Sequence, residues 1–566
     1  MEKKGKIKKL DKTQIYFILK GIFVGLLTGI VVSLFRLSIE KLGDFVRSIY
    51  EISREQPIYL VGMAICCILA AFFVGYLVKN EPDIKGSGIP QVEGQLRGEL
   101  SMNWFSVLWK KFIGGVLSVG AGLFLGREGP SIQLGAAIGQ GAGQLFRSPS
   151  SEEKILISSG ASSGLAAAFN APIAGLLFVL EEIHHSFSPL VWLTSFAAAI
   201  TANFVSLYFF GLRPVLYLGD LPSLPLKYYG SLVVLGVLLG VLGFIYQKVL
   251  LALPKFYNRL PLPAYFHGFV PFLLILPIGY LWPSTLGGGN QIVLAFGHAS
   301  LPIIMIIGLF VLRFVFSMIS YGGGLPGGIF LPILTLGALI GSFYGNIMVD
   351  FGMDPIYIKD FVVIAMAGYF TAIGKAPLTA IILVTEMVGS LNHLMPLGLA
   401  ALVAYIVNDL LGGNPIYESL LERLLGNNQT PALKGARTTF DFPVTAESSL
   451  DGLMVRDFNW PKNMLLISIR RGNQEILTHG DTIMNVGDIL VILTDEANLP
   501  RIKQEIEAKS SITNLKQSFY RPGKNYFMAQ QLLIYTTLTL QKKKRLDFPS
   551  LFFLFLCFCY CRSFSQ

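Results

Sequence analysis

The chain has 566 residues, of which 53% are hydrophobic and 14% are charged, and its mean hydropathy is +0.59. Soluble globular domains carry about 25% charged residues, so this composition excludes a soluble protein and indicates a membrane protein. The formal net charge of +10 fits basic loops and a basic tail beside a membrane, and we expect no nucleic-acid partner.

The N-terminal segment MEKKGKIKKLDKT contains six lysines and leads directly into an apolar run. That run has full membrane-spanning length and lacks the small-residue cleavage site of a signal peptide. Lysines that flank a first span favour a cytoplasmic N-terminus. We therefore expect residues 1–14 to be a basic cytoplasmic segment and the protein to be a multi-pass protein of the cell membrane.

Apolar runs recur along the chain as far as residue 411. Several have about 20 residues, the length that a helix needs to cross the hydrocarbon core of a bilayer, whereas others are interrupted by Gly and Pro. They predict an all-α polytopic membrane domain over residues 15–425. The runs are Tyr16–Leu37, Tyr59–Val78, Gly114–Leu125, Leu190–Phe210, Gly230–Leu251, Phe269–Leu281, Leu301–Ile319 and Leu397–Leu411.

Three sequence blocks occur twice in the same order. GREGPSIQLGAAIG (126–139) and GGIFLPILTLGALIG (327–341) share the pattern G-x3-P-x4-G-x3-G at an offset of 202 residues. Similar offsets relate KGSGIPQV (85–92) to GGGNQIV (287–293), and NAPIAGLLFVLEE (170–182) to KAPLTAIILVTEM (375–387). Transporters built from two such repeats commonly have inverted topology, with the substrate site where the halves meet. We therefore expect two inverted repeats of broken helices, about 15–225 and 226–425.

Each repeated block is a Gly/Pro-rich breaker followed by an apolar helix. Irregular backbone within a membrane is tolerated where it lines a cavity. A helix that begins there presents unbonded N–H groups and the positive end of its dipole to that cavity. Several such ends together can bind an anion without a full positive charge, which would hold a halide too tightly for release.

Four motifs together resemble the CLC family of chloride channels and proton–chloride antiporters: GSGIP (86–90), GREGP (126–130), GGIFLP (327–332) and NPIY (414–417). They follow the family's order, in a membrane domain of the family's length. The resemblance implies a homodimer in a lipid bilayer that transports chloride. It also implies that Ser87 and Tyr417 offer hydroxyl groups to a central chloride, and that the backbone N–H groups of Ile329 and Phe330 complete its shell.

Glu128 lies inside an apolar region, where an ionised carboxylate is costly unless other groups stabilise it. The resemblance implies that Glu128 is the external gate: its carboxylate competes with chloride when ionised and swings away when protonated. The sequence alone also allows Glu128 to pair with Arg127. For Ser87 it allows an N-cap of the helix that starts near Pro90, and for Tyr417 an interfacial aromatic position.

The two repeats align Glu181 with Glu386 but place Glu182 opposite Met387. An acid at the C-terminal end of a helix opposes the helix dipole, so a second carboxylate there suggests a function. The resemblance implies that Glu182 is the internal proton-transfer residue of antiporters. The alternative is a carboxylate at the membrane rim, paired with a loop lysine.

Two further sets of polar residues have ordinary interpretations. Glu93 and Arg97 are four residues apart on one predicted helix, and we expect them to form an ion pair. Of the five cysteines, Cys66 and Cys67 lie in a span and three lie in the tail, without the spacing of a zinc site or a disulfide framework. We expect no metal and no cofactor.

The resemblance to the CLC family, together with these features, implies proton-coupled chloride exchange. A passive voltage- or pH-gated chloride channel is the alternative. A membrane enzyme, or a sensor built on a transporter fold, is a further alternative. The sequence contains no metal-ligand cluster, phosphate-binding loop or nucleophile–base pair that would favour an enzyme.

A soluble domain is predicted after residue 430, where the density of charged residues rises abruptly. MLLISIRR (464–471), QEILT (474–478) and DILVILT (488–494) predict strands, Gly472-Asn473 predicts a hairpin turn, and NLPRIKQEIEAK (498–509) predicts an amphipathic helix. Residues 437–508 resemble the TrkA-C (RCK-C) regulatory domain of transporters, on ISIRRGNQEILTHGDTIMNVGDILVIL (467–493). The resemblance implies a small cytoplasmic α/β domain with a small-molecule ligand. The sequence assigns no role to the tail, residues 511–566, because its apolar run is too short to span a bilayer, which leaves a membrane-surface anchor as an alternative.

Overall fold

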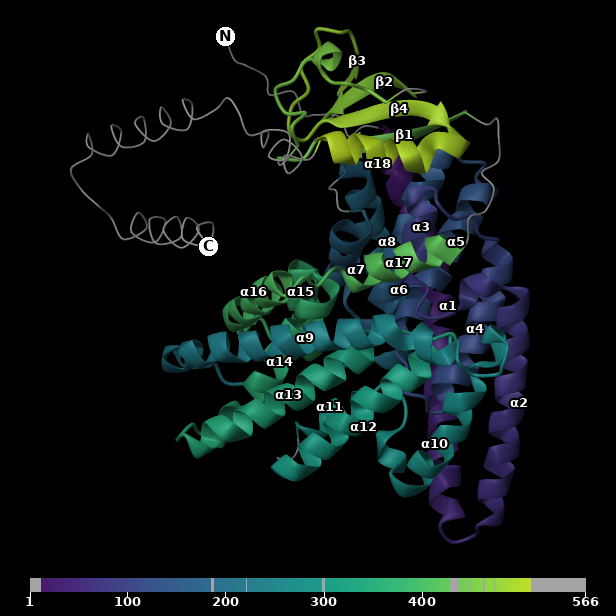
Figure 1. Ribbon diagram of the computed structural model, residues 1–566, viewed down its shortest axis with the longest axis vertical. Helices are drawn as coiled ribbons and strands as arrows, with labels where there is room; N and C mark the ends of the chain where they lie inside the picture. Colours follow the sequence, from purple (N-terminus) through teal and green to yellow (C-terminus); the bar gives the residue numbers. More distant parts are fainter. Residues whose placement is uncertain are drawn as a thin grey trace, which may run out of the picture. The chain divides into compact units, whose positions relative to one another are not determined.

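The computed structural model describes residues 12–184, 188–219, 221–297, 301–427, 437–446, 448–461, 464–472 and 474–510. They form two compact units: the first extends to Phe440 and includes the short segment Leu493–Pro500, and the second holds the remaining residues after Phe440. The first unit holds helices α1 to α17, and the second is a small α/β unit (Figure 1). This confirms the predicted fold class. The N-terminal basic segment up to residue 11 and the tail from residue 511 lie outside the described residues.

The first unit contains the membrane-spanning helices of this multi-pass membrane protein. Within the described ranges, eight helices are long and apolar enough to cross a membrane. The helices of the first half are α1 Lys12–Ser53, α2 Ile58–Asn80, α3 Ile89–Arg97, α4 Trp104–Gly120, α5 Glu128–Leu145, α6 Ser150–Phe169, α7 Pro172–Phe178 and α8 Pro189–Phe210. Those of the second half are α9 Tyr229–Tyr257, α10 Phe269–Leu281, α11 Asn290–Ala295, α12 Ile303–Gly322, α13 Phe330–Asp350, α14 Ile358–Gly374, α15 Pro377–Val388, α16 Leu394–Leu410 and α17 Ile416–Asn427.

The predicted runs fall on helices of the structure, but two helices that are long enough to cross a membrane, α13 and α14, were missed, and one run needs correction. Helix α10 coincides with its predicted run, and α8 begins one residue earlier than predicted. The run Gly114–Leu125 was wrong as a continuous helix, because α4 ends at Gly120 and Gly122 has φ +90°. A left-handed glycine breaks the helix here, and the apolar residues after it belong to the breaker that leads into α5.

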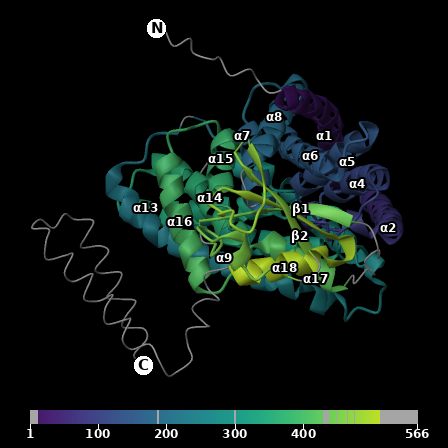
Figure 2. The same cartoon turned by 90° about the horizontal axis from the view of Figure 1, so that it is seen from above.

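The repeated glycines allow helices to pack backbone against backbone. A Cβ atom at Gly135 would overlap the carbonyl oxygen of Gly160, so α5 lies directly on α6. In the second half, a Cβ atom at Gly341 would overlap the carbonyl oxygen of Phe361, so α13 lies equally close to α14. Helix α1 lies beside α8 in the same manner (Figure 2). Such close packing associates helices in lipid, where no hydrophobic effect draws them together.

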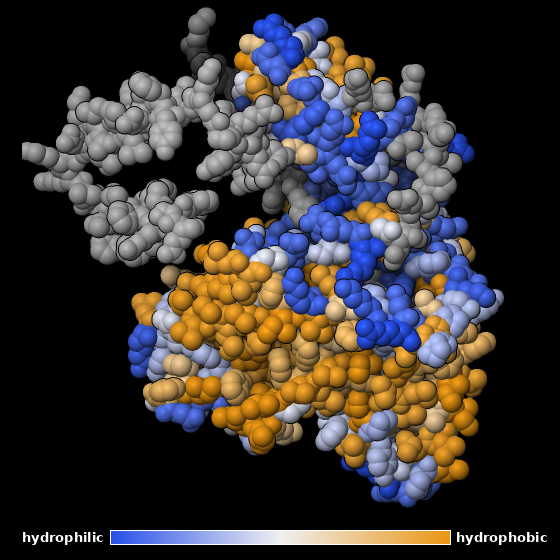
Figure 3. All heavy atoms as spheres, in the orientation of Figure 1, coloured by the Kyte–Doolittle hydropathy of each residue, from blue (hydrophilic) through white to orange (hydrophobic). Residues whose placement is uncertain are grey.

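The surface of the membrane unit exposes many large apolar side chains. They form a broad orange area on the visible face of this unit, which includes helix α9 (Figure 3). Such a surface is suited to a hydrocarbon surrounding rather than to water. The large apolar side chains that α9 exposes are Val233, Val234, Val237, Val241, Ile245 and Phe256.

The second unit contains a four-stranded sheet with strand order β1-β4-β2-β3. Its elements are β1 Arg437–Pro443, β2 Met464–Arg471, β3 Gln474–Leu477, β4 Ile489–Asp495 and α18 Leu499–Ser510. Strands β2 and β3 are antiparallel with Arg471 opposite Gln474, which confirms the predicted two-residue turn. Asn473 of that turn lies outside the described residues. Strand β1 was missed, although the alternation of buried Phe440 and Phe442 with exposed Asp441 could have marked it.

The packing of α5 on α6 predicts a sharp difference between two glycines. In Gly135→Val, the new side chain has no room against the α6 backbone, and we expect a loss of about 3 kcal/mol or more of stability. Gly308→Val is the matched control, because a Cβ atom at this position in α12 meets no atom within 4 Å. Thermal unfolding of the detergent-purified variants tests this. Equal stability of the two variants would contradict the packing.

Candidate ion-binding site

Three of the four glycine-rich breakers meet inside the membrane unit. Gly126 N–H donates to the Gly328 carbonyl oxygen, and Gly328 N–H donates to the Gly126 carbonyl oxygen, both at 2.7 Å. Gly327 N–H donates to the Gly86 carbonyl oxygen at 3.0 Å. Corresponding breakers from the two repeats are thus bonded reciprocally, as a two-fold pseudo-symmetry requires.

Three helices begin beside this junction. Helix α3 follows Gly88, α5 begins at Glu128, and α13 begins at Phe330. A Cβ atom at Gly129 would lie 2.8 Å from Ser87 Cβ, so the first turn of α5 touches the breaker before α3. The N-terminal ends of these helices carry unbonded N–H groups and partial positive charge, which favours an anion at their meeting point.

Ser87 lies at this meeting point and is buried. Its Oγ accepts a hydrogen bond from Ile89 N–H at 3.3 Å, but Gly88 is the N-cap residue of α3, so Ser87 meets the helix start from one position before the cap. The hydroxyl hydrogen remains available for a further acceptor. The hydroxyl of Tyr321, at the end of α12, interacts with Ser87, which sequence reasoning missed. Tyr321 lies far from Ser87 in the sequence, so no spacing between the two residues indicates that they are neighbours in the fold.

Tyr417 is completely buried at the start of α17, with its ring edge-on to Phe178 at 6.5 Å. This burial contradicts the interfacial interpretation of Tyr417. Among the described residues, its hydroxyl has no hydrogen-bond partner. It interacts electrostatically with Glu182, Tyr321 and Glu128, so it lies in the same polar neighbourhood as both glutamates.

The backbone N–H groups of Ile329 and Phe330 stand at the very start of α13. Ile329 is the N-cap residue of the helix and Phe330 is its first helical residue, so neither N–H has an acceptor within the helix. The Phe330 ring packs against the Phe370 ring at 4.4 Å between centroids. This packing holds the helix start beside the breaker junction.

Glu128 is completely buried at the first position of α5. Its carboxylate turns back over the preceding turn, where a Cβ atom at Gly126 would collide with Glu128 Oε2. In the described part of the chain, neither carboxylate oxygen has a hydrogen-bond partner that meets ordinary geometry. Arg127 forms its ion pair with Glu40 Oε1 at 2.7 Å, and not with Glu128. The simple Arg127–Glu128 pair is therefore not formed.

Glu181 and Glu386 have matching structural roles. Glu181 accepts from the N–H groups of Leu378 at 3.1 Å and Thr379 at 2.6 Å, at the start of α15. Glu386 accepts from the N–H groups at the start of α7, at 3.2 and 2.8 Å. Each repeat therefore caps a helix of the other repeat, which the alignment of the two glutamates did not reveal.

Glu182 lacks such a capping partner and lies in a π-helical turn, Val179–Ile183. Its side chain is buried, and within the described residues it forms no ion pair with a lysine, contrary to the rim interpretation. Turns of this kind occur frequently at functional sites.

Three further carboxylates act on Glu182: Glu93, Glu181 and Glu418. Arg97 joins two of them, because its Nη2 lies 2.5 Å from Glu93 Oε1 and 3.1 Å from Glu418 Oε1. The predicted Glu93–Arg97 ion pair is thus confirmed. The Glu418 side chain is 39% exposed, so this charged cluster connects the neighbourhood of Glu182 with the surface of the unit.

Two buried cationic side chains donate hydrogen bonds to carbonyl oxygens of the breakers. Lys111 Nζ donates to the carbonyl oxygens of Ile84 and Gly86, each at 2.8 Å. In the second half, Arg313 Nη1 donates to the carbonyl oxygens of Thr285 at 3.0 Å and Gly287 at 2.8 Å. Lys111 and Arg313 are separated by the repeat offset, and their bonds to the backbone support a structural role.

Comparison with protein families gives two matches. The model of the voltage gated chloride channel family matches residues 70–409. The model of the TrkA-C domain matches residues 440–507. The first match covers more than half of the chain, and the second covers the small α/β unit.

Individual relatives agree with the family match. The chain is 34% identical over 440 residues to the H(+)/Cl(-) exchange transporter ClcA of Vibrio cholerae, covering 74% of this chain and 92% of that protein. It is 35% identical over 427 residues to the protein of the same name from Vibrio parahaemolyticus, covering 72% of this chain and 89% of that protein.

Among solved structures, a slow cyanobacterial Cl-/H+ antiporter superposes with a TM-score of 0.70 and 32% identity, covering 73% of this chain and 99% of that one. A eukaryotic CLC transporter superposes with a TM-score of 0.61 and 21% identity, covering 74% of this chain and 77% of that one, and supports the fold alone. The breaker junction, the reciprocal helix caps and these matches lead to one conclusion: the chain belongs to the voltage gated chloride channel (CLC) family and carries a C-terminal TrkA-C domain.

Proposed function

We propose that this protein exchanges chloride for protons across the membrane in which it resides. The relatives named as H(+)/Cl(-) exchange transporters support this function. The observation that carries it is the pair of buried carboxylates: Glu128 at the breaker junction and Glu182 in the π-helical turn. Two other buried acids of the membrane unit, Glu93 and Asp360, pair with Arg97 and His393, whereas among the described residues Glu182 forms no ion pair.

Chloride occupies the meeting point of the helix ends in this proposal. Ser87 Oγ and Tyr417 Oη donate hydrogen bonds to it, and the N–H groups of Ile329 and Phe330 complete its shell. The free hydroxyl of Tyr417 and the unbonded helix-end N–H groups support these roles. None of these ligands carries a full charge, so the ion is bound without being trapped.

Glu128 is the external gate. When ionised, its carboxylate is an anion that competes with chloride for the same N–H donors. When protonated, it loses this attraction and leaves the path to chloride. Its burial at the first turn of α5, without a cation of its own, supports this competition. One carboxylate thus couples proton binding to access of the anion.

Glu182 is the internal proton-transfer residue. Protons reach it from the cytoplasm past the charged cluster of Glu93, Arg97 and Glu418. They then cross to Glu128 through the neighbourhood of Tyr417, which interacts with both glutamates. A passive chloride channel is the alternative function, and it gives no reason for a buried carboxylate at Glu182.

The orientation follows from the charge of the N-terminus. The lysines of residues 1–14 favour a cytoplasmic N-terminus, so the far end of α1, from Glu40 onward, faces the outside. The TrkA-C domain then lies in the cytoplasm as a regulatory domain for a small-molecule ligand. The proposal includes a homodimer, which the resemblance to the family implies.

The gate assignment predicts that Glu128→Gln uncouples the two ions. Glutamine resembles the protonated carboxyl group and cannot release a proton. We expect chloride flux to persist and proton movement to fall below detection. Simultaneous chloride-electrode and pH-electrode recordings from proteoliposomes measure this. Proton pumping by Glu128→Gln under a chloride gradient would show that another residue is the gate.

The proton-transfer role of Glu182 predicts that Glu182→Gln also separates chloride flux from proton flux. This substitution removes a titratable group with little change in shape, so chloride flux should continue while proton coupling collapses. Glu181→Gln is the matched control, because it removes a carboxylate from the same turn that caps α15. We expect it to lower thermal stability and to keep the proton-to-chloride ratio. If both variants keep that ratio, protons do not pass through Glu182.

A further inference from the structure

A cavity of about 310 Å³ lies beside the breaker junction. One face of α1 lines it, together with the loop that leads into α5, the Leu286–Gly289 breaker, and Leu331 at the start of α13. The same Leu331 lies next to the Glu128 carboxylate, because both are neighbours of Gly126. The cavity is therefore the outer mouth of the ion path in the proposed orientation.

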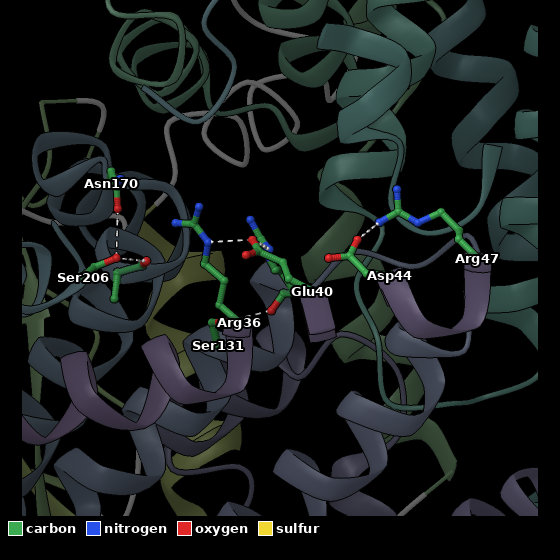
Figure 4. Close-up of polar contacts among 9 residues, drawn as sticks. Arg36, Glu40, Asp44, Arg47, Ser131, Asn170 and Ser206 are labelled. Atoms are coloured by element: carbon green, nitrogen blue, oxygen red, sulfur yellow. Dashed lines mark hydrogen bonds and ion pairs between the residues drawn. The ribbon is translucent and has the colours of Figure 1, made fainter. Parts of the chain in front are cut away.

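Four charged side chains line this cavity: Glu40, Asp44 and Arg47 from α1, and Arg127 from the loop before α5. Asp44 and Arg47 pair with each other at 2.6 Å (Figure 4). Glu40 is engaged differently. Its Oε1 accepts from Arg36 Nε at 3.0 Å and from Arg127 Nη1 at 2.7 Å.

Glu40 therefore bridges two guanidinium groups with one oxygen. Figure 4 shows the Arg36 side chain directed at Glu40 within the same helix. Arg36 is held further by the Phe210 ring, whose centroid lies 3.8 Å from Arg36 Cζ. Arg127 is only 7% exposed, whereas the Glu40 side chain is 39% exposed, so the bridging carboxylate faces the cavity and its arginines lie behind it.

Both arginines act on the gate. Arg127 directly precedes Glu128 in the chain, and Arg36 and Arg127 are the two cations that interact electrostatically with Glu128. Among the described residues, Arg127 Nε and Nη2 and Arg36 Nη1 are buried without a partner. These guanidinium groups thus have donors to spare, and among the described residues Glu40 is the carboxylate that forms ion pairs with them.

We propose that Glu40 is a positioning residue that holds Arg127 and sets the pH at which the Glu128 gate opens. This inference rests on the proposed gating role of Glu128. With Glu40 ionised, the cluster of Arg36, Arg127 and Glu40 carries one net positive charge. Without that carboxylate it carries two, and the ionised form of Glu128 is stabilised further. More acid is then needed to protonate the gate.

The other charges near the gate are already engaged. Lys111 and Arg313 are bound to breaker carbonyl oxygens, and Asp44 and Arg47 neutralise each other. The Glu93–Arg97 pair lies with Glu182 and not in the cavity. Glu40 is thus the group whose charge bears on Arg127 by direct contact.

The test is the pH dependence of chloride flux in proteoliposomes that contain the full-length protein. Glu40→Gln should shift the midpoint towards acid by about one pH unit, so that flux at the wild-type midpoint falls about fivefold. Flux at acidic pH, where the gate is protonated in both proteins, should equal that of the wild type. A misfolded variant would instead lose flux at every pH.

Asp44→Asn is the matched control, since it removes a carboxylate from the same helix and cavity but one that pairs with Arg47. Its midpoint should stay at the wild-type value. An equal shift in Asp44→Asn would mean that only the total charge of the mouth matters, and would overturn the proposal. An unchanged midpoint in Glu40→Gln would overturn it as well.

Combining Glu40→Gln with Glu128→Gln in one protein separates this inference from the proposed function. In Glu128→Gln, the flux should no longer depend on pH in this range, and adding Glu40→Gln should change nothing. A midpoint shift that persists in the double variant would show that Glu40 acts on a group other than the gate. If Glu128→Gln alone still moves protons, the gate assignment itself fails, whatever Glu40 does.

Discussion

The reciprocal hydrogen bonds between Gly126 and Gly328 hold the two repeats together at the point where α5 and α13 begin. Both positions leave little room for a side chain: a Cβ atom at Gly126 would displace the Glu128 carboxylate, and one at Gly328 would lie 3.2 Å from Gly129 N. Broken helices are costly in a membrane unless their free backbone groups find partners. Here the two breakers satisfy each other, which leaves the N–H groups of the helix starts for an anion.

The distribution of charge around this junction follows a simple division. The side chains of Lys111 and Arg313, which carry full positive charges, donate hydrogen bonds to backbone carbonyl oxygens. Arg127 instead forms an ion pair with Glu40. The proposed chloride ligands are neutral hydroxyl and N–H groups. A site of this kind binds an anion weakly enough to release it, and it lets the protonation of one carboxylate decide whether the anion enters.

Sequence reasoning reached the features that depend on local pattern. The apolar run that became α10, the hairpin of β2 and β3, and the Glu93–Arg97 pair were all predicted within a few residues. Contacts between distant segments were not. Tyr321 beside Ser87 and Glu40 beside Arg127 join separate helices, so no spacing in the sequence marks them. The π-helical turn at Glu182 also lacks a sequence signature. The alignment of Glu182 with Met387 pointed to a function for Glu182 but not to this turn.

The central claim is that chloride and proton movements are coupled in one molecule. Purified protein in liposomes, with a chloride gradient directed outward, equal pH on both sides and the membrane potential clamped, tests it most directly. We expect chloride efflux to drive protons inward against the pH difference that builds up, and a protonophore to abolish that difference. Chloride efflux without any proton movement would contradict exchange and identify a passive channel.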